Sequence, residues 1–181
     1  MIIGENGLLI GGPYIPSPNF DARPDGIEVE LLVVHGISLP PDQFGGDEVA
    51  RLFTNTLDCA AHPYFEKLRH ACVSAHFYIR RNGRVLQFVP CTRRAWHAGA
   101  SNWRGRERCN DFSIGIELEG ADHLPYADAQ YTSLARLSFA LRRRYSLIDI
   151  VGHSDIAPGR KTDPGHAFDW GRFRTLLSAL S

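Results

Sequence analysis

Two histidines and one aspartate in this chain have the residue types and the spacing of a metal site. His153 follows the apolar run Leu147–Val151, and Asp163 comes ten residues later, in a loop that ends in a Pro-Gly turn. His35 follows a second apolar run, Leu31–Val34. Zinc binds imidazole nitrogen and carboxylate oxygen readily, and three protein ligands with one open position is its catalytic arrangement. These three residues are therefore the predicted ligands of a catalytic zinc ion.

Other interpretations of the histidines stay open at this point. His35 alone could be an ordinary hydrogen-bonding residue, and iron or manganese would accept the same ligand types as zinc. His76 begins a predicted strand and would support the site or belong to the core. His97, in the Trp96–Gly99 loop, either lines the site or has a structural role. The remaining histidines are predicted to be surface or capping residues: His62, His70, His123 and His166.

A hydrolytic metal site also needs a group that moves protons. Glu117 is the best candidate, because it projects from an otherwise apolar strand, where an unused and unpaired carboxylate is costly. Glu119 is the alternative base, but it lies nearer the strand end, where we expect it to be solvated or to support the site. Lys161 could stabilise an oxyanion with its fixed positive charge. Its alternative role is a salt bridge to Asp163 or Asp155.

The pattern of apolar residues predicts elements that bring these groups to one edge of a sheet. The predicted strands are Leu31–Val34, Ala75–Arg80, Arg84–Val89, Ser113–Glu119 and Leu147–Val151. The predicted helices are 47–53, His62–His70, Ala127–Tyr145 and a C-terminal helix marked by Trp170, Phe173, Leu176 and Leu177. Asn82-Gly83 is a hairpin turn signal, and Pro13–Asp25 reads as an extended arm. Strands alternating with helices predict an α/β fold, with a mixed β-sheet flanked by helices. Ligands in such folds gather at the carboxyl ends of strands.

Composition narrows the classes of partner and compartment. The chain has 181 residues, which suits a single domain spanning 1–181, with 20 Lys+Arg against 20 Asp+Glu. This balance gives no electrostatic attraction to nucleic acid or membrane, so neither partner is expected. The four cysteines form no C-x-x-C pair and are expected to be reduced thiols. The first residues show no signal-peptide pattern, and we expect a cytoplasmic protein.

The chain resembles the zinc-dependent N-acetylmuramoyl-L-alanine amidases, most closely the cytoplasmic AmpD type. The resemblance runs from Pro16 through Phe173 and rests on the segments Leu31–His35, Phe44–Gly46, Val73–His76, Arg94–Gly99, Gly105–Gly120 and Gly152–Gly165. It implies zinc ligation by the same three residues, Glu117 as catalytic acid and base, and Lys161 as the transition-state stabiliser. It also implies a fold shared with peptidoglycan recognition proteins and some phage amidases.

The resemblance further implies a substrate, the 1,6-anhydromuramoyl peptides released during cell-wall turnover, cut between the lactyl group and L-alanine. Trp96 could stack on a sugar face, Arg108 could bind a peptide carboxylate bidentately, and His97 could contact the substrate. Their alternative is a solvated basic loop around a buried tryptophan. Gly36 and Cys72 depart from the asparagine and arginine expected in close relatives, so they concern fine substrate recognition, including preference for the anhydro sugar.

Two other functions fit the same segments. A lytic amidase would act on intact peptidoglycan, but it would need export and usually a wall-binding module, and the sequence shows the pattern of neither. A non-catalytic peptidoglycan receptor on the same fold would lack a metal ligand, whereas all three predicted ligands are present. The sequence therefore favours a recycling amidase over a lytic enzyme or a receptor.

Overall fold

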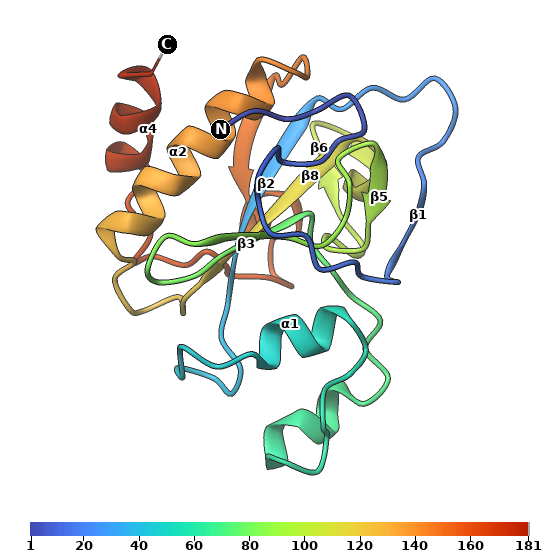
Figure 1. Ribbon diagram of the computed structural model, residues 1–181, viewed down its shortest axis with the longest axis vertical. Helices are drawn as coiled ribbons and strands as arrows, with labels where there is room; N and C mark the ends of the chain where they lie inside the picture. Colours follow the sequence, from blue (N-terminus) through green and yellow to red (C-terminus); the bar gives the residue numbers. More distant parts are fainter. Residues whose placement is uncertain (181) are drawn as a thin grey trace.

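A five-stranded mixed sheet forms the centre of the molecule (Figure 1). The computed structural model describes residues 1–180. In sheet order the strands are β4 (Val85–Gln87), β3 (Phe77–Ile79), β8 (Ser113–Glu119), β2 (Leu31–Ile37) and β9 (Asp149–Gly152). β2 runs parallel to both β8 and β9, β3 runs parallel to β8, and β4 pairs antiparallel with β3 at the edge. The predicted α/β fold with a mixed sheet is confirmed.

Different elements cover the two faces of the sheet. Helices α2 (Asp128–Arg142) and α4 (Trp170–Ser178) lie together against one face, seen at the left of Figure 1. Alternate residues of β2, including Leu32 and Val34, belong to the core cluster on that side. On the other face, Leu31 and Val33 pack with the short helix α3 (His153–Ile156) and with residues around the 3-10 helix η2 (Cys109–Asp111). Burial on both faces explains why this strand reads as a continuous apolar run.

Short paired strands and an extended arm complete the sheet side of the molecule. β1 (Phe20–Ala22) pairs with β5 (Arg93–Ala95), and β6 (Asn102–Trp103) pairs with β7 (Arg106–Glu107). The arm that precedes β1 donates backbone hydrogen bonds from Ile15 and Ser17 to the carbonyls of Gln87 and Phe88, at 2.9 and 3.0 Å. The predicted extended arm therefore follows the β4 edge.

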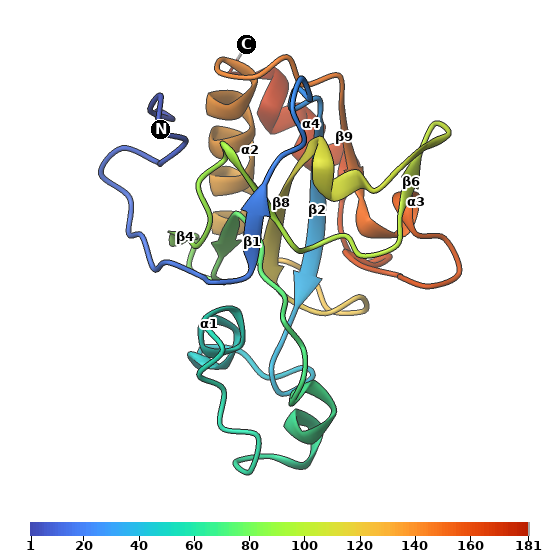
Figure 2. The ribbon, with the colours of Figure 1, turned by 90° about the vertical axis from the view of Figure 1, so that its right-hand side faces the viewer.

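A separate group of short elements lies beyond the end of the sheet (Figure 2). It contains α1 (Glu48–Phe53) and the 3-10 helix η1 (Pro63–Leu68). The side chain of His62 accepts a hydrogen bond from the Tyr64 amide at 3.1 Å, so His62 caps η1 as predicted. The segment predicted as a helix over His62–His70 is thus shorter and wound as a 3-10 helix.

Several predicted boundaries differ from the observed ones. β2 continues through Ile37, so His35 lies inside the strand and not at its end. The predicted helix Ala127–Tyr145 ends at Arg142, because Tyr145 leaves the helix and packs against the core. The hairpin strands are three residues each, joined through Gly83 at φ +82°, a left-handed conformation that glycine adopts without strain.

Candidate metal centre and active site

The strand register brings three chemically active residues side by side. His35 of β2 pairs with Glu117 of β8. On the other side of β2, Val34 pairs with Gly152 of β9. The residues that follow this pair, His35 and His153, therefore lie next to each other. All three therefore lie in one row across neighbouring parallel strands, near their carboxyl ends, as the sequence predicts.

The three predicted metal ligands converge on one point. The Nδ1 atoms of His35 and His153 lie 2.9 Å apart, and the Asp163 Oδ2 atom lies 3.2 and 3.1 Å from them, respectively. Among residues 1–180, this is the group of histidine, cysteine or acidic side chains whose ligand atoms come together, within 4.8 Å of one another. Two imidazoles and one carboxylate in this arrangement can hold a metal ion.

The loop that carries Asp163 is fixed at two places. The backbone carbonyl of Asp163 accepts a hydrogen bond from the Ser154 amide at 3.0 Å. The hydroxyl of Tyr126 donates to the carbonyl of Pro164 at 2.9 Å. Burial raises the pKa of the Asp163 carboxyl, but the His153 and His35 rings that contact it outweigh this and hold that pKa well below its ordinary value. Asp163 is therefore an ionised carboxylate at neutral pH.

His35 is held as a neutral imidazole. Its side chain is fully buried, and burial is the main reason that its pKa falls to about 4, with the nearby His153 acting in the same direction and Asp163 opposing. The neutral imidazole is the form that ligates metals. His35 and Asp163 are thus already in the protonation states that bind a metal.

Glu117 lies at the edge of the donor set. Its Oε1 atom is 3.9 Å from His35 Nδ1, and its Oε2 atom is buried with no hydrogen-bond partner in the part of the chain that the structure describes. Burial, followed by the negative charge of Asp163, raises the pKa of Glu117 well above its ordinary value. A buried polar atom without a partner points to a missing ligand or ion, and a raised pKa suits a group that exchanges protons near neutral pH.

Glu119, the alternative base, has a structural position. It is 3 % exposed, so the expectation that it is solvated is wrong. Its two carboxylate oxygens accept hydrogen bonds from the Gly45 and Arg81 amides, at 2.6 and 2.8 Å. The carboxylate therefore ties the loop before α1 to the end of the sheet, and its oxygens are already paired.

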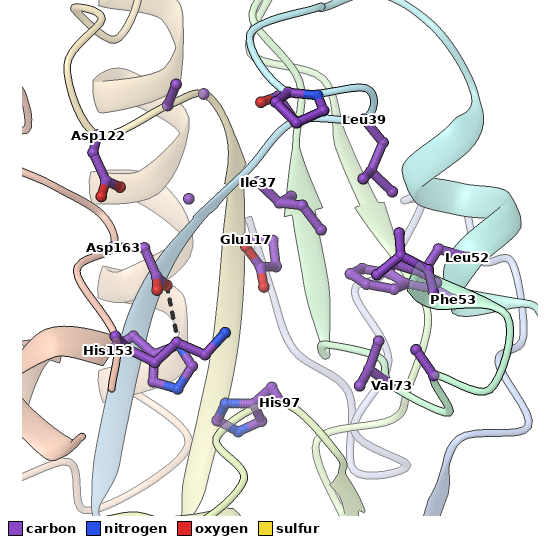
Figure 3. Close-up of a pocket in the computed structure, with 18 of the residues that line it drawn as sticks. Ile37, Leu39, Leu52, Phe53, Val73, His97, Glu117, Asp122, His153 and Asp163 are labelled. Carbon is purple, nitrogen blue, oxygen red and sulfur yellow. Dashed lines mark hydrogen bonds and ion pairs between the residues drawn. The ribbon is translucent and has the colours of Figure 1, made fainter. Parts of the chain in front are cut away.

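A cleft of about 550 Å³ opens beside these groups. Figure 3 shows Asp163, His153, His97 and Glu117 along one wall. The opposite wall consists of apolar side chains from the segment around α1 and from the strand entry after η1: Leu39, Leu52, Phe53 and Val73. Glu117, His153 and Asp163 are thus accessible to a molecule bound between the walls.

The structure brings two more of the predicted site residues to the cleft. Trp96 and Lys161 both line it, from the loop after β5 and from the loop after α3. Lys161 is exposed, and within residues 1–180 it forms no salt bridge within 4.0 Å to Asp163 or Asp155, the alternative partners, because the ion pairs of Asp163 are with histidines. The ammonium group is therefore available to a substrate.

Arg108 is placed differently. Its side chain is 70 % exposed, makes an ion pair with Asp111 at 3.3 Å, and does not line the cleft. Its role as a substrate contact stays a prediction. Gly36 and Cys72, which differ from the residues expected in close relatives, lie in different places. Gly36 lines the cleft, where any side chain would overlap the Tyr126 hydroxyl, whereas Cys72 lines a smaller neighbouring hollow.

His97 contacts the proposed metal ligand His35 directly. Its Nδ1 atom lies 2.9 Å from His35 Nε2, and its Nε2 atom lies 3.2 Å from the Ser113 hydroxyl. Burial and the nearby His35 lower the pKa of His97 well below its ordinary value. His76, by contrast, belongs to the core, where its Nδ1 atom accepts a hydrogen bond from the Gly115 amide at 3.0 Å.

Sequence reasoning missed two residues near the site. Asn110 accepts hydrogen bonds from the His97 and Ala98 amides through its side-chain oxygen. His123, predicted to be a surface residue, also lines the cleft and lies 3.7 Å from the carboxylate of Asp42. Neither residue has a local sequence signal, because both act through contacts with distant segments.

Known proteins share both this sequence and this fold. Residues 25–166 match the family model described as N-acetylmuramoyl-L-alanine amidase. The 1,6-anhydro-N-acetylmuramyl-L-alanine amidase AmpD of Escherichia coli (strain K12) is 58% identical over 176 residues, which cover 96% of each chain. A crystal structure of a selenomethionine AmpD derivative superposes with a TM-score of 0.95 at 55% identity, covering 98% of this chain and 99% of that one.

A more distant relative was solved with a substrate. The E. coli amidase AmiD, in complex with anhydro-N-acetylmuramic acid-L-Ala-D-gamma-Glu-L-Lys, has a TM-score of 0.61 and 32% identity. The alignment covers 85% of this chain and 60% of that one. Separately, none of the helices within residues 1–180 combines the length and the apolar character needed to cross a membrane. By sequence and by fold, this chain belongs to the N-acetylmuramoyl-L-alanine amidase family and is an amide hydrolase of that family.

Proposed function

We propose that this enzyme hydrolyses the amide bond between the lactyl group and L-alanine of 1,6-anhydromuramoyl peptides, in cell-wall recycling in the cytoplasm, with zinc as its metal. The observation that carries the proposal is the convergence of His35, His153 and Asp163 beside Glu117. The name of the E. coli relative and the substrate in the AmiD complex support the choice of an anhydromuramoyl peptide.

The residues present fit a zinc ion. His35 and His153 offer imidazole nitrogens, Asp163 offers a carboxylate oxygen, and three such ligands leave a fourth position for water or substrate. When bound, the ion supplies Lewis acidity, which lowers the pKa of water from 15.7 toward roughly 7. The buried Oε2 atom of Glu117, which has no hydrogen-bond partner among residues 1–180, is consistent with a site that is completed by further molecules.

Glu117 carries the proton transfers in this proposal. Its carboxylate takes a proton from the attacking water and returns it to the nitrogen of L-alanine as the amide bond breaks. Burial and Asp163 raise the pKa of Glu117, which favours its protonated form, the form that donates the proton to the leaving nitrogen. The exposed ammonium of Lys161, on the same cleft, stabilises the negative oxygen of the tetrahedral intermediate.

The remaining cleft residues bind the substrate. Trp96 offers an indole face to the sugar, and the apolar wall formed by Leu39, Leu52, Phe53 and Val73 accommodates the less polar parts of the muramoyl peptide. Arg108 and His97 stay predicted substrate contacts, His97 from within the cleft and Arg108 from the exposed surface outside it. The proposal needs no nucleic acid, membrane or protein partner.

The test is amide cleavage, followed by mass spectrometry, of anhydromuramoyl tripeptide and intact peptidoglycan in parallel, each with and without a chelator. We expect chelator-sensitive release of free tripeptide from the small substrate, restored by added zinc. Comparable cleavage of the intact polymer would instead assign a lytic amidase. No cleavage of either substrate by zinc-loaded protein would contradict the proposal.

A further inference from the structure

Both histidine ligands contact the same short segment of the chain, His153 through a backbone carbonyl and His35 through a side chain, and we propose that this segment sets their tautomers. The segment, Trp96–Ala98, lies in the loop after β5, and the side chain of Asn110 holds it. In this inference, which rests on the proposed metal site, His97 and Asn110 are positioning residues. They keep the Nδ1 atoms of His35 and His153 free of hydrogen and directed at the ion.

The contact of His153 provides an acceptor for the tautomer in which Nδ1 ligates the metal. Its Nε2 atom lies 3.1 Å from the carbonyl oxygen of Ala98. A carbonyl oxygen can only accept, so it stabilises the neutral imidazole that carries its hydrogen on Nε2, and we infer that this contact outweighs that of the Asp163 carboxylate with Nδ1. The lone pair of Nδ1 is then free, and Nδ1 is the atom that faces Asp163 and His35.

His35 is held through a side chain instead of a carbonyl. Its Nε2 atom lies 2.9 Å from Nδ1 of His97, and Nε2 of His97 lies 3.2 Å from the Ser113 hydroxyl. If His35 is to offer Nδ1 to a metal, its Nε2–H donates to His97, and His97 must in turn donate its own Nε2–H to Ser113. The three side chains form one chain of hydrogen bonds with a single consistent direction.

Asn110 fixes the position of both acceptors. Its Oδ1 atom accepts from the backbone amides of His97 and Ala98, at 3.2 and 2.8 Å. Arg160 adds a third contact by donating to the Ala98 carbonyl at 2.6 Å. The amide of Asn110 therefore controls the segment that orients both ligands, although Asn110 touches neither histidine ligand.

The space for His97 depends on a glycine. Gly115 lies on β8, and a Cβ atom at this position would overlap the imidazole of His97. The ring thus rests directly on the strand backbone, between Ser113 and the metal ligands. This packing leaves the ring few alternative orientations, which suits a residue whose task is to hold another side chain.

Partners of this kind matter to metal affinity. Hydrogen bonds to the second nitrogen of a ligating histidine fix its tautomer, and their loss typically costs about 10- to 100-fold in metal affinity or activity. Here one side chain serves two ligands, so we expect the Asn110→Leu substitution to lie at the upper end, with a zinc dissociation constant raised about 100-fold.

Three variants test the inference by chelator competition for zinc. Asn110→Leu removes the acceptor, and Asn110→Asp keeps an oxygen in the same place and should retain zinc affinity within a few-fold. Asn102→Leu is the matched control, because the Asn102 side chain accepts from the Gly105 amide at 2.9 Å in the neighbouring β6–β7 turn and does not hold the segment Trp96–Ala98. An unchanged zinc affinity in folded Asn110→Leu overturns the proposal.

A second measurement needs no variant and no metal. Nitrogen-15 NMR of the metal-free wild-type protein at neutral pH reports the tautomer of each imidazole. The Asp163 carboxylate faces both Nδ1 atoms and competes for the hydrogen, but we expect the Ala98 carbonyl and His97 to hold it on Nε2 of His153 and His35 before zinc is added. A mixture of tautomers at either residue overturns the proposal. If the wild type binds no zinc at all, the proposed function fails, while the NMR result still decides whether the segment sets the tautomers.

Discussion

The two walls of the cleft differ in how their side chains are held. On the metal wall, His35, His153 and Asp163 come from paired strands or from a loop tied by hydrogen bonds, and the second nitrogen of each histidine has a partner. On the opposite wall, Leu39, Leu52 and Phe53 are placed by apolar packing around α1. The groups that must be placed accurately around a metal are thus held by the sheet and its hydrogen bonds, whereas the binding surface is formed by short irregular elements.

The metal wall should show the largest single effect. Asp163→Ala removes one of three ligands. We expect the rate of amide cleavage to fall about 10³-fold and the bound zinc, measured by elemental analysis, to be lost. Asp128→Ala is the control, since this carboxylate is 86 % exposed and pairs with Arg172 on the far helix face. If Asp163→Ala kept stoichiometric zinc, the assignment of the metal wall would be wrong.

The two glutamates of β8 should have different roles, Glu117 in catalysis and Glu119 in stability. Glu117→Gln should keep its zinc and lose about 10²- to 10⁴-fold in kcat, the usual contribution of a positioned acid and base. Glu119→Gln should retain kcat within a few-fold but lower the free energy of unfolding by about 1–3 kcal/mol, because one of two backbone amides loses its carboxylate acceptor. Steady-state kinetics and urea unfolding on both variants distinguish the roles, and the reverse pattern would make Glu119 the base.

Lys161 tests whether charge on the cleft acts in the transition state. Lys161→Met keeps the length of the side chain and removes the charge, and we expect kcat to fall about 10²-fold with little change in KM. Lys161→Arg should recover part of the rate. A change confined to KM would show that the ammonium binds the ground state of the substrate instead.

The buried histidines should make the stability of the metal-free protein sensitive to acid. Burial lowers the pKa of His35 to about 4 and that of His76 to about 3, from 6.5, so below about pH 6.5 the unfolded chain binds protons that the folded chain does not. Stability is therefore full above this range and falls as the pH drops toward 4, by about 2 kcal/mol per histidine at pH 5.

Glu117 acts in the opposite direction. Its raised pKa means that the folded chain takes up a proton at a higher pH than the unfolded chain does, which partly offsets the loss. Urea unfolding of the metal-free protein at about pH 7.5 and about pH 5 should show a net loss, and a steeper one in Glu117→Gln. His70→Gln, at an exposed position, should follow the wild type. A stability that stays flat across this range would contradict the burial argument.

The smallest effects belong to substrate contacts. Trp96→Leu should raise KM about tenfold through loss of an aromatic face, with kcat nearly unchanged. Arg108→Ala should change KM by less, because the side chain is largely exposed and lies outside the cleft. A larger effect of Arg108 than of Trp96, in kinetics on anhydromuramoyl tripeptide, would mean that the substrate reaches beyond the two walls.

The parts of this molecule that the sequence reveals are those determined locally. Apolar runs followed by histidine predict the strand that carries His35 and the strand that leads into His153, and Asn82-Gly83 predicts the hairpin of β3 and β4. The mixed sheet and the convergence of the ligands follow from these elements, because the carboxyl ends of parallel strands meet.

The remaining features depend on contacts between segments far apart in the chain. Glu119 has the pattern of a solvated strand end, and only the approach of Gly45 and Arg81 makes it buried. His97 and Asn110 have no periodic signal, and their connection to the ligands arises when the loop after β5 folds over β8. A 3-10 helix at η1 likewise follows from packing and not from local preference.

The pairing of β2 with β8 has a consequence for which genetic changes the enzyme tolerates. Seven residue pairs keep His35 opposite Glu117, and side chains alternate between faces along each strand. Deleting any one residue between Leu31 and Val34 would turn His35 toward the wrong face or shift the whole strand, with the same effect as removing the ligand. A deletion in the loop Ser38–Gly46, only a few residues later, leaves this alignment intact. Tolerance to changes in chain length should therefore drop abruptly at the start of β2 and recover just beyond Ile37.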